Sequence, residues 1–274
     1  MYCIQSQHMT IFNFVRQSVK LYTSYLPIFI NGNWYYIDPV NVGLTKSMLI
    51  GKYERMSTKL VREIIKPGWN VLDVGGYIGY YTIIFSKLVR QSGKVYVIEP
   101  DPVRMGILKR NLRLNKLTNV TPYQLAAGNK KGGASLYVPE INTSDARLIC
   151  PKDEKRRKIR VKINTLDNLF HKNHTRIDFI KMDIQGFEGK ALKGAKKLLS
   201  LNKSIYLHVE FWSKGLKESG TNPKTLLRML ERLDFKIFAI DDNNMKLLPM
   251  KNANMLIELS QNNPAEFVDI LCKR

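Results

Sequence analysis

Asp73, Gly75 and Gly79 form the pattern Asp-x-Gly-x-x-x-Gly, and Glu99 follows Asp73 after 26 residues. Glycine lets a backbone approach a ligand closely, and a carboxylate one βαβ step further on accepts the hydroxyls of a ribose. A carboxylate directly before the glycines repels a pyrophosphate but attracts positive charge. These residue types therefore predict a site for S-adenosylmethionine, which carries an ammonium and a sulfonium.

Two other nucleotide motifs are absent from this turn. The dinucleotide fingerprint G-x-G-x-x-G fails because Tyr77 stands at the third position counted from Gly75. The phosphate loop G-x-x-x-x-G-K-[ST] is also missing. A tight turn requires glycine with or without a ligand, so the prediction depends on the combination of the glycines with Glu99.

A second group of polar residues follows later strands. Lys181 and Asp183 lie two residues apart in a predicted strand and share a face, and Glu210 ends the next strand. If the acceptor of a methyl group is a hydroxyl, the transfer needs a base for the proton or a cation beside the alkoxide. We therefore predict Asp183 as general base or orienting group, Lys181 as its charge partner and Glu210 as a second candidate base. The alternative is that Lys181 and Asp183 only pair and cap the following helix.

Other ionisable residues fit structural roles. His208 shares a strand face with Glu210 and is interpreted as a core histidine. His171 and His174 have no third ligand nearby, so no metal site is predicted. Glu188 lies in the first turn of a predicted helix, where the helix dipole favours a carboxylate regardless of function.

Alternating strand and helix patterns position these residues. The alternation predicts a doubly wound, mostly parallel, seven-stranded Rossmann-like α/β sheet, with ligands at the carboxyl ends of its strands. The expected strands are 71–74, 94–100, 119–127, 177–184, 204–212, 235–241 and 254–259.

Residues 1–52 are predicted to form an N-terminal elaboration, and residues 53–274 the catalytic domain. The elaboration begins with an amphipathic helix carrying Phe12, Val15, Val19 and Tyr22, and continues with a hairpin around residues 31–33. Such a helix packs on the domain or rests on a membrane surface. A basic insertion at about 132–164 is expected over one end of the sheet.

The chain is strongly basic, with 44 Lys and Arg against 23 Asp and Glu and a formal net charge of +21. This charge favours polyanionic partners, although it also fits lysines that are merely solvated. The cysteines, Cys3, Cys150 and Cys272, form no metal or disulfide pattern, which favours a reducing compartment. We therefore expect a cytoplasmic protein with peripheral membrane contact as an option.

Several motifs resemble the FkbM-type family of S-adenosylmethionine-dependent methyltransferases from about Tyr53 to Asp241. They read YE, KPGWNVLDVGGYIGYYT, VIEPDP, AAGNKKGGASLYVP, INTLDNL, IDFIKMDIQGFEGKALKGA and HVEF. The family usually has Ala-Asn where this chain has Gly76 and Tyr77. The cofactor site implied by the resemblance includes Asp73, Gly75, Gly76, Tyr77, Gly79, Glu99, Pro100, Ala126 and Ala127.

The resemblance implies O-methylation of a hydroxyl on a sugar, a glycan or glycolipid, or a natural product, including anionic ones. The basic surface keeps a second hypothesis open, an RNA methyltransferase acting on ribose or base. RNA comes second because no Pro-Pro-aromatic turn follows the fourth strand and no RNA-binding module signature is present. A lipid-linked glycan substrate and a non-catalytic binding module are further alternatives.

Overall fold

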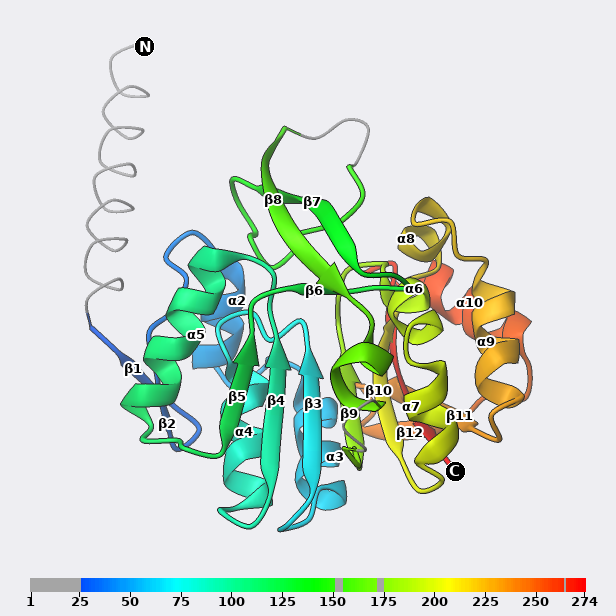
Figure 1. Ribbon diagram of the computed structural model, residues 1–274, viewed down its shortest axis with the longest axis horizontal. Coiled ribbons are helices and arrows are strands. Elements are labelled where there is room, and N and C mark those ends of the chain that lie inside the picture. Colours follow the sequence, from blue (N-terminus) through cyan, green and yellow to red (C-terminus); the bar gives the residue numbers. More distant parts are fainter. Residues whose placement is uncertain (1–25, 151–154, 172–174, 264) are drawn as a thin grey trace.

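The computed structural model describes residues 26–150, 155–171, 175–263 and 265–274. The helix predicted around Phe12 lies outside these residues. An eight-stranded sheet in the order β12-β11-β13-β10-β9-β3-β4-β5 forms the centre, with helices on both faces (Figure 1). Its strands are β3 (Asn70–Val74), β4 (Lys94–Ile98), β5 (Val120–Tyr123), β9 (Phe179–Met182), β10 (Tyr206–Phe211), β11 (Lys236–Asp241), β12 (Lys246–Pro249) and β13 (Val268–Lys273).

The direction of the strands creates a crevice at one edge of the sheet. β5, β4, β3, β9 and β10 run parallel, and β13 lies antiparallel between β10 and β11. The chain winds outward from β3 to β5 and then crosses back to β9. The strand order therefore reverses between β3 and β9, and ligands of doubly wound sheets bind at the carboxyl ends beside such a switch point.

Two hydrophobic clusters cover the two faces of the sheet. On β3, Val71 belongs to the cluster with α3, α4 and α5, while Leu72 belongs to the cluster with α6 to α10. This alternation follows from the two-residue period of a strand. The helices are α2 (Val42–Leu49), α3 (Arg55–Ile64), α4 (Tyr80–Val89), α5 (Pro102–Leu114), the π-helix η1 (Asp167–His171), α6 (Glu188–Lys193), α7 (Lys196–Leu201), α8 (Ser213–Glu218), α9 (Pro223–Glu231) and α10 (Ala253–Asn262).

The α/β fold class is confirmed, but the predicted strand count of seven and the strand at 254–259 are wrong. That segment belongs to α10, because the Asn252 side chain accepts from the Met255 amide and caps a helix there. Leu256 and Ser260, four residues apart, face the interior of the protein. β12 and β13 take the remaining places in the sheet.

Two smaller β-structures flank the sheet. β1 (Ile28–Ile30) and β2 (Asn33–Tyr35) form a hairpin, as expected from the sequence. A three-stranded sheet of β6 (Ala126–Ala127), β8 (Arg156–Asn164) and β7 (Gly132–Pro139) stands over the carboxyl edge of the large sheet (Figure 1). Residues 126–127 therefore belong to this second sheet and do not continue β5, as the sequence analysis had assumed.

Candidate active site

A cavity of about 560 Å³ lies at the carboxyl edge of the large sheet. The insertion between β7 and β8 contributes residues 142–148 to its wall. The cavity is lined by all predicted cofactor-site residues except Gly79, namely Asp73, Gly75, Gly76, Tyr77, Glu99, Pro100, Ala126 and Ala127. The predicted catalytic residues Asp183, Lys181 and Glu210 line the same cavity.

Glu99 is buried directly after β4 and is held by the backbone. One carboxylate oxygen accepts from the Tyr77 amide at 2.9 Å and the other from the Asp101 amide at 2.8 Å. Burial raises the pKa of Glu99 to about 8, although both amide bonds act in the opposite direction. Each oxygen keeps a further lone pair, so a fixed acceptor faces the cavity where a ribose could donate.

Asp73 lies at the end of β3 and is also buried. Its carboxylate accepts from the Thr82 hydroxyl at 2.6 Å. Burial raises its pKa to about 6, while Lys181 and the Thr82 hydrogen bond oppose the shift. A cationic ligand group beside this carboxylate would favour its ionised form.

The glycine turn is required by the fold itself. Gly75 has a φ of +91°, and a Cβ placed on it would lie 1.9 Å from the backbone oxygen of Asp183. Gly79 has a φ of +93° and is the N-cap of α4. The turn thus brings the end of β3 against the end of β9, which places the two predicted groups of residues in one cavity.

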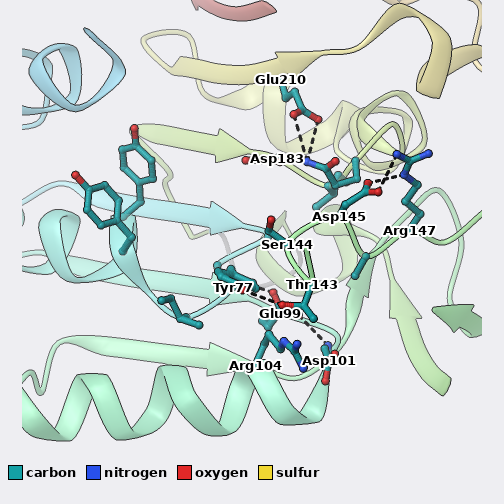
Figure 2. Close-up of a pocket in the computed structure, with 18 of the residues that line it drawn as sticks. Tyr77, Glu99, Asp101, Arg104, Thr143, Ser144, Asp145, Arg147, Asp183 and Glu210 are labelled. Carbon is teal, nitrogen blue, oxygen red and sulfur yellow. Dashed lines mark hydrogen bonds and ion pairs between the residues drawn. The ribbon is translucent and has the colours of Figure 1, made fainter. Parts of the chain in front are cut away.

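Tyr77 joins this turn to two distant segments. Its hydroxyl donates to Asp38 at 2.9 Å and lies 3.0 Å from the Thr143 hydroxyl (Figure 2 shows Tyr77 and Thr143). Asp38 also accepts from Thr143 and pairs with Arg104 at 2.7 Å. The side chain that replaces the family's asparagine therefore ties the N-terminal segment and the insertion to the cavity.

Asp183 and Glu210 lie side by side at the end of the cavity away from Glu99 (Figure 2). Asp183 follows β9, its side chain is 27% exposed, and it pairs with Lys181 at 3.3 Å. Burial alone would lower the pKa of Lys181, but Asp183 and the surrounding carboxylates together raise the pKa of this lysine above its ordinary value. Lys181 and Asp183 therefore pair, as both interpretations of the sequence expected, but neither caps α6, because Phe187 is the N-cap of this helix.

The sequence did not place Glu54, and it did not predict Asp269, although both carboxylates line this cavity. Glu54 accepts from the Tyr81 hydroxyl at 2.7 Å, and Asp269 reaches the cavity from β13. Burial is the main cause that raises the pKa values of Asp269 and Glu210. The YE motif was a signal for Glu54, whereas Asp269 lies in a strand that the sequence analysis did not predict.

The insertion and β10 meet above this end of the cavity. The Arg147 guanidinium lies 4.3 Å from the centre of the Trp212 ring. Arg147 also forms two hydrogen bonds to Asp145, at 2.5 and 2.9 Å. These contacts hold the insertion against the end of β10.

His208 and Glu188 have structural surroundings, as expected. His208 is buried beside Ser57 at 2.9 Å, and burial lowers its pKa to about 3. Glu188 accepts from the backbone amides of Ile184 and Gly186. Among the described residues, no group of three or more His, Cys, Asp and Glu side chains is arranged to hold a metal ion.

A Rossmann-like sheet with this acidic, glycine-lined crevice defines a methyltransferase that uses S-adenosylmethionine. The chain belongs to the FkbM methyltransferase family, because the profile of the methyltransferase FkbM domain matches residues 73–237. Asp73, Glu99 and the turn between them fit this cofactor, since the two buried carboxylates face a cavity that a cationic nucleoside could fill.

Individual relatives share only short segments with this chain. A protein-L-isoaspartate O-methyltransferase of Methanothrix thermoacetophila is 37% identical over 57 residues, 21% of this chain and 27% of the relative. A ribosomal protein L11 methyltransferase of Acetivibrio thermocellus is 32% identical over 88 residues, 32% of this chain and 28% of the relative. The chain thus matches less than a third of either relative's length.

Solved structures cover more of the chain at low identity. A SAM-dependent methyltransferase of Aquifex aeolicus is 18% identical, with 85% of this chain and 96% of that chain covered and a TM-score of 0.47. A putative methyltransferase of Streptococcus mutans in complex with SAH is 14% identical, with 80% of this chain and 96% of that chain covered and a TM-score of 0.44. The family assignment depends on the sequence match and not on these scores.

Proposed function

We propose that the protein methylates a hydroxyl on a sugar, a glycan or glycolipid, or a natural product. The observation that carries this proposal is Asp183, a carboxylate that is oriented by Lys181 and partly exposed in the same cavity as Asp73 and Glu99. When bound, S-adenosylmethionine supplies an electrophilic methyl group on sulfur.

The residues of the cavity have different roles in the proposed reaction. Asp73 and Glu99 hold the cofactor, with backbone contacts from the turn at Gly75–Tyr77. A carboxylate oxygen of Asp183 accepts the proton of the acceptor hydroxyl, and the Lys181 ammonium stabilises negative charge nearby. Glu210 is the second candidate base.

The charges in the cavity favour a neutral acceptor group. The cations among the lining residues are each paired with a carboxylate: Lys181 with Asp183, Arg147 with Asp145 and Arg104 with Asp38. Three further lining carboxylates, Glu54, Glu210 and Asp269, form no ion pair within the described part of the chain. Among the described residues, no lining cation is left unpaired to bind a phosphate or sulfate, so we narrow the acceptor to a neutral, hydroxyl-rich group.

RNA is the second candidate, and the outer surface of β8 favours it. Arg157, Lys158, Arg160 and Lys162 are exposed on this strand. Such a surface could follow a phosphate backbone outside the cavity while a ribose hydroxyl enters it. An RNA-binding mode predicts affinity that falls steeply with salt.

The domain division and the location of the protein complete this proposal. Residues 53–274 form the catalytic domain and residues 1–52 its elaboration, in a cytoplasmic protein for which peripheral contact to membranes is an option. No helix within the described residues has the length and apolar character to cross a bilayer.

Transfer of labelled methyl from S-adenosylmethionine into fractionated extract of the source cells tests the proposal. We expect label in the saccharide, glycolipid or small-molecule fraction with the wild type. Asp183→Asn should bind the cofactor normally but transfer methyl about 100-fold more slowly, because the base is lost. Label confined to RNA would overturn the saccharide, glycolipid or natural-product acceptor proposed first, and undiminished transfer by Asp183→Asn would overturn the role of Asp183 as base.

A further inference from the structure

Gln185 has a backbone position that its neighbours fix. Its φ of 53° lies in the left-handed region, which is unusual for a residue other than glycine. The amides on either side, of Ile184 and Gly186, both donate to one oxygen of the buried Glu188, at 2.9 and 3.2 Å. A Cβ on Gly186 would lie 2.7 Å from the backbone of Gly215, so α8 closes the other side of this turn. The direction of the Gln185 side chain is therefore determined by the fold.

The amide of Gln185 lies between the two candidate bases. Its Nε2 is 2.9 Å from Asp183 Oδ1, and 3.2 and 3.3 Å from the two oxygens of Glu210. An amide nitrogen carries two hydrogens, so one serves Asp183 and the other is shared by the oxygens of Glu210. The reversed amide would place its oxygen against carboxylate oxygens, which is unfavourable when they are ionised.

Asp183 consequently receives a donor on each oxygen. Gln185 serves Oδ1, and Lys181 serves Oδ2 at 3.3 Å. Charge-assisted hydrogen bonds of this kind fix both the rotation and the charge of a carboxylate. Without the amide, Asp183 would keep Lys181 as its only side-chain donor within the described residues, and its Oδ1 would have no partner to fix it.

We propose that Gln185 is a positioning residue for Asp183: its amide holds this carboxylate toward the acceptor and links it to Glu210. The inference rests on the proposed function, in which Asp183 accepts the proton. The titratable groups that interact electrostatically with Asp183 from the surrounding elements are Tyr53, Asp73, Lys181, Glu188, His208, Glu210 and Asp269.

Two substitutions separate positioning from structure. Gln185→Met keeps the length of the side chain but removes the donor, and Gln185→Glu replaces the donor with a third acid. Both keep a Cβ at the left-handed position, so they share any backbone cost. Gln261→Met, at an exposed position of α10, is the matched control.

We expect kcat of Gln185→Met to fall roughly 10- to 100-fold, with little change in KM for the cofactor or in Tm. The acidic limb of its kcat–pH profile should move to higher pH, because the general base then loses a hydrogen bond that stabilises its ionised form. Gln185→Glu should move the limb further, and Gln261→Met should match the wild type. An equal loss of kcat at every pH, or a loss of cofactor affinity, would overturn the positioning role.

Carboxyl ¹³C NMR provides a readout that needs no acceptor. The Asp183 resonance, assigned by its absence in Asp183→Asn, should have a different chemical shift in Gln185→Met than in the wild type at the same pH, because the hydrogen bond to Oδ1 is lost. Identical chemical shifts would overturn the inference about Gln185. If the chemical shift changes but no saccharide, glycolipid or small-molecule fraction is ever labelled, the role of Gln185 stands and the proposed acceptor fails.

Discussion

Replacing Gly75 with alanine tests whether the glycine turn serves the fold or only the approach of a ligand. The new Cβ would lie 1.9 Å from the backbone oxygen of Asp183, whereas real Cβ atoms essentially never come closer than 3.0 Å. The ends of β3 and β9 would therefore have to separate by about 1 Å. The amide of Asp183 donates to the oxygen of Val74 at 3.0 Å, so this separation also strains a hydrogen bond between the strands.

The expected loss of stability has two parts. A left-handed backbone costs a residue with a Cβ about 1–2 kcal/mol. Forcing extra volume into a packed region costs a further ~1–3 kcal/mol. Urea unfolding should therefore show that Gly75→Ala loses about 2–5 kcal/mol, a large part of the ~5–15 kcal/mol that holds a typical domain together.

Gly106→Ala is the matched control. Gly106 is exposed in α5, and nothing lies within 4 Å of a Cβ placed on it. Alanine at such a helical position should stabilise the protein by ~0.5–1 kcal/mol. Equal urea midpoints for Gly75→Ala and the wild type would refute the packing argument. Normal stability with lost cofactor binding would show instead that the ligand requires this glycine.

Two further predictions concern buried carboxylates. Because folded Asp73 keeps its proton up to about pH 6 while its unfolded value is 3.8, stability without ligand should fall as the pH rises between these values. This decrease in the free energy of unfolding should amount to about 2–3 kcal/mol and should be absent in Asp73→Asn. Parallel stability–pH curves for the variant and the wild type would contradict this prediction. Asp38→Asn removes the nearer charge partner of the buried Arg104, leaves Asp101 at 3.6 Å as the other, and should cost about 3 kcal/mol in urea unfolding. Glu63→Gln, which breaks the exposed ion pair Lys59–Glu63, is the comparison. A smaller loss of stability in Asp38→Asn than in Glu63→Gln would contradict the prediction.

The sequence predicted the parts of the site that depend on local pattern. Strand, glycine turn and helix are contiguous around Asp73 and Gly79, so their period and turn residues identify them directly. Glu99 and Asp183 follow later parallel strands, and the carboxyl ends of parallel strands meet at one edge. The fold class and the main cavity residues were therefore predictable.

The remaining contacts depend on pairings between distant segments. The apolar residues in 254–259 are compatible with either a strand or a helix. The segment is helical because the Asn252 side chain caps the first turn of α10. With 254–259 as the last predicted strand, the predicted sheet has no strand that contains Asp269. The contact of Tyr77 with Asp38 joins residues 39 positions apart, which no periodicity encodes.

Some residues that line the cavity lie outside the range matched by the FkbM domain. Glu54 precedes the matched residues 73–237 and Asp269 follows them, while both line the cavity. A fragment cut at the boundaries of the match would keep the turn for the cofactor but leave the opposite end open to solvent. Flanking sequence can therefore diverge and change which molecule is methylated, while the segment that binds the methyl donor is preserved.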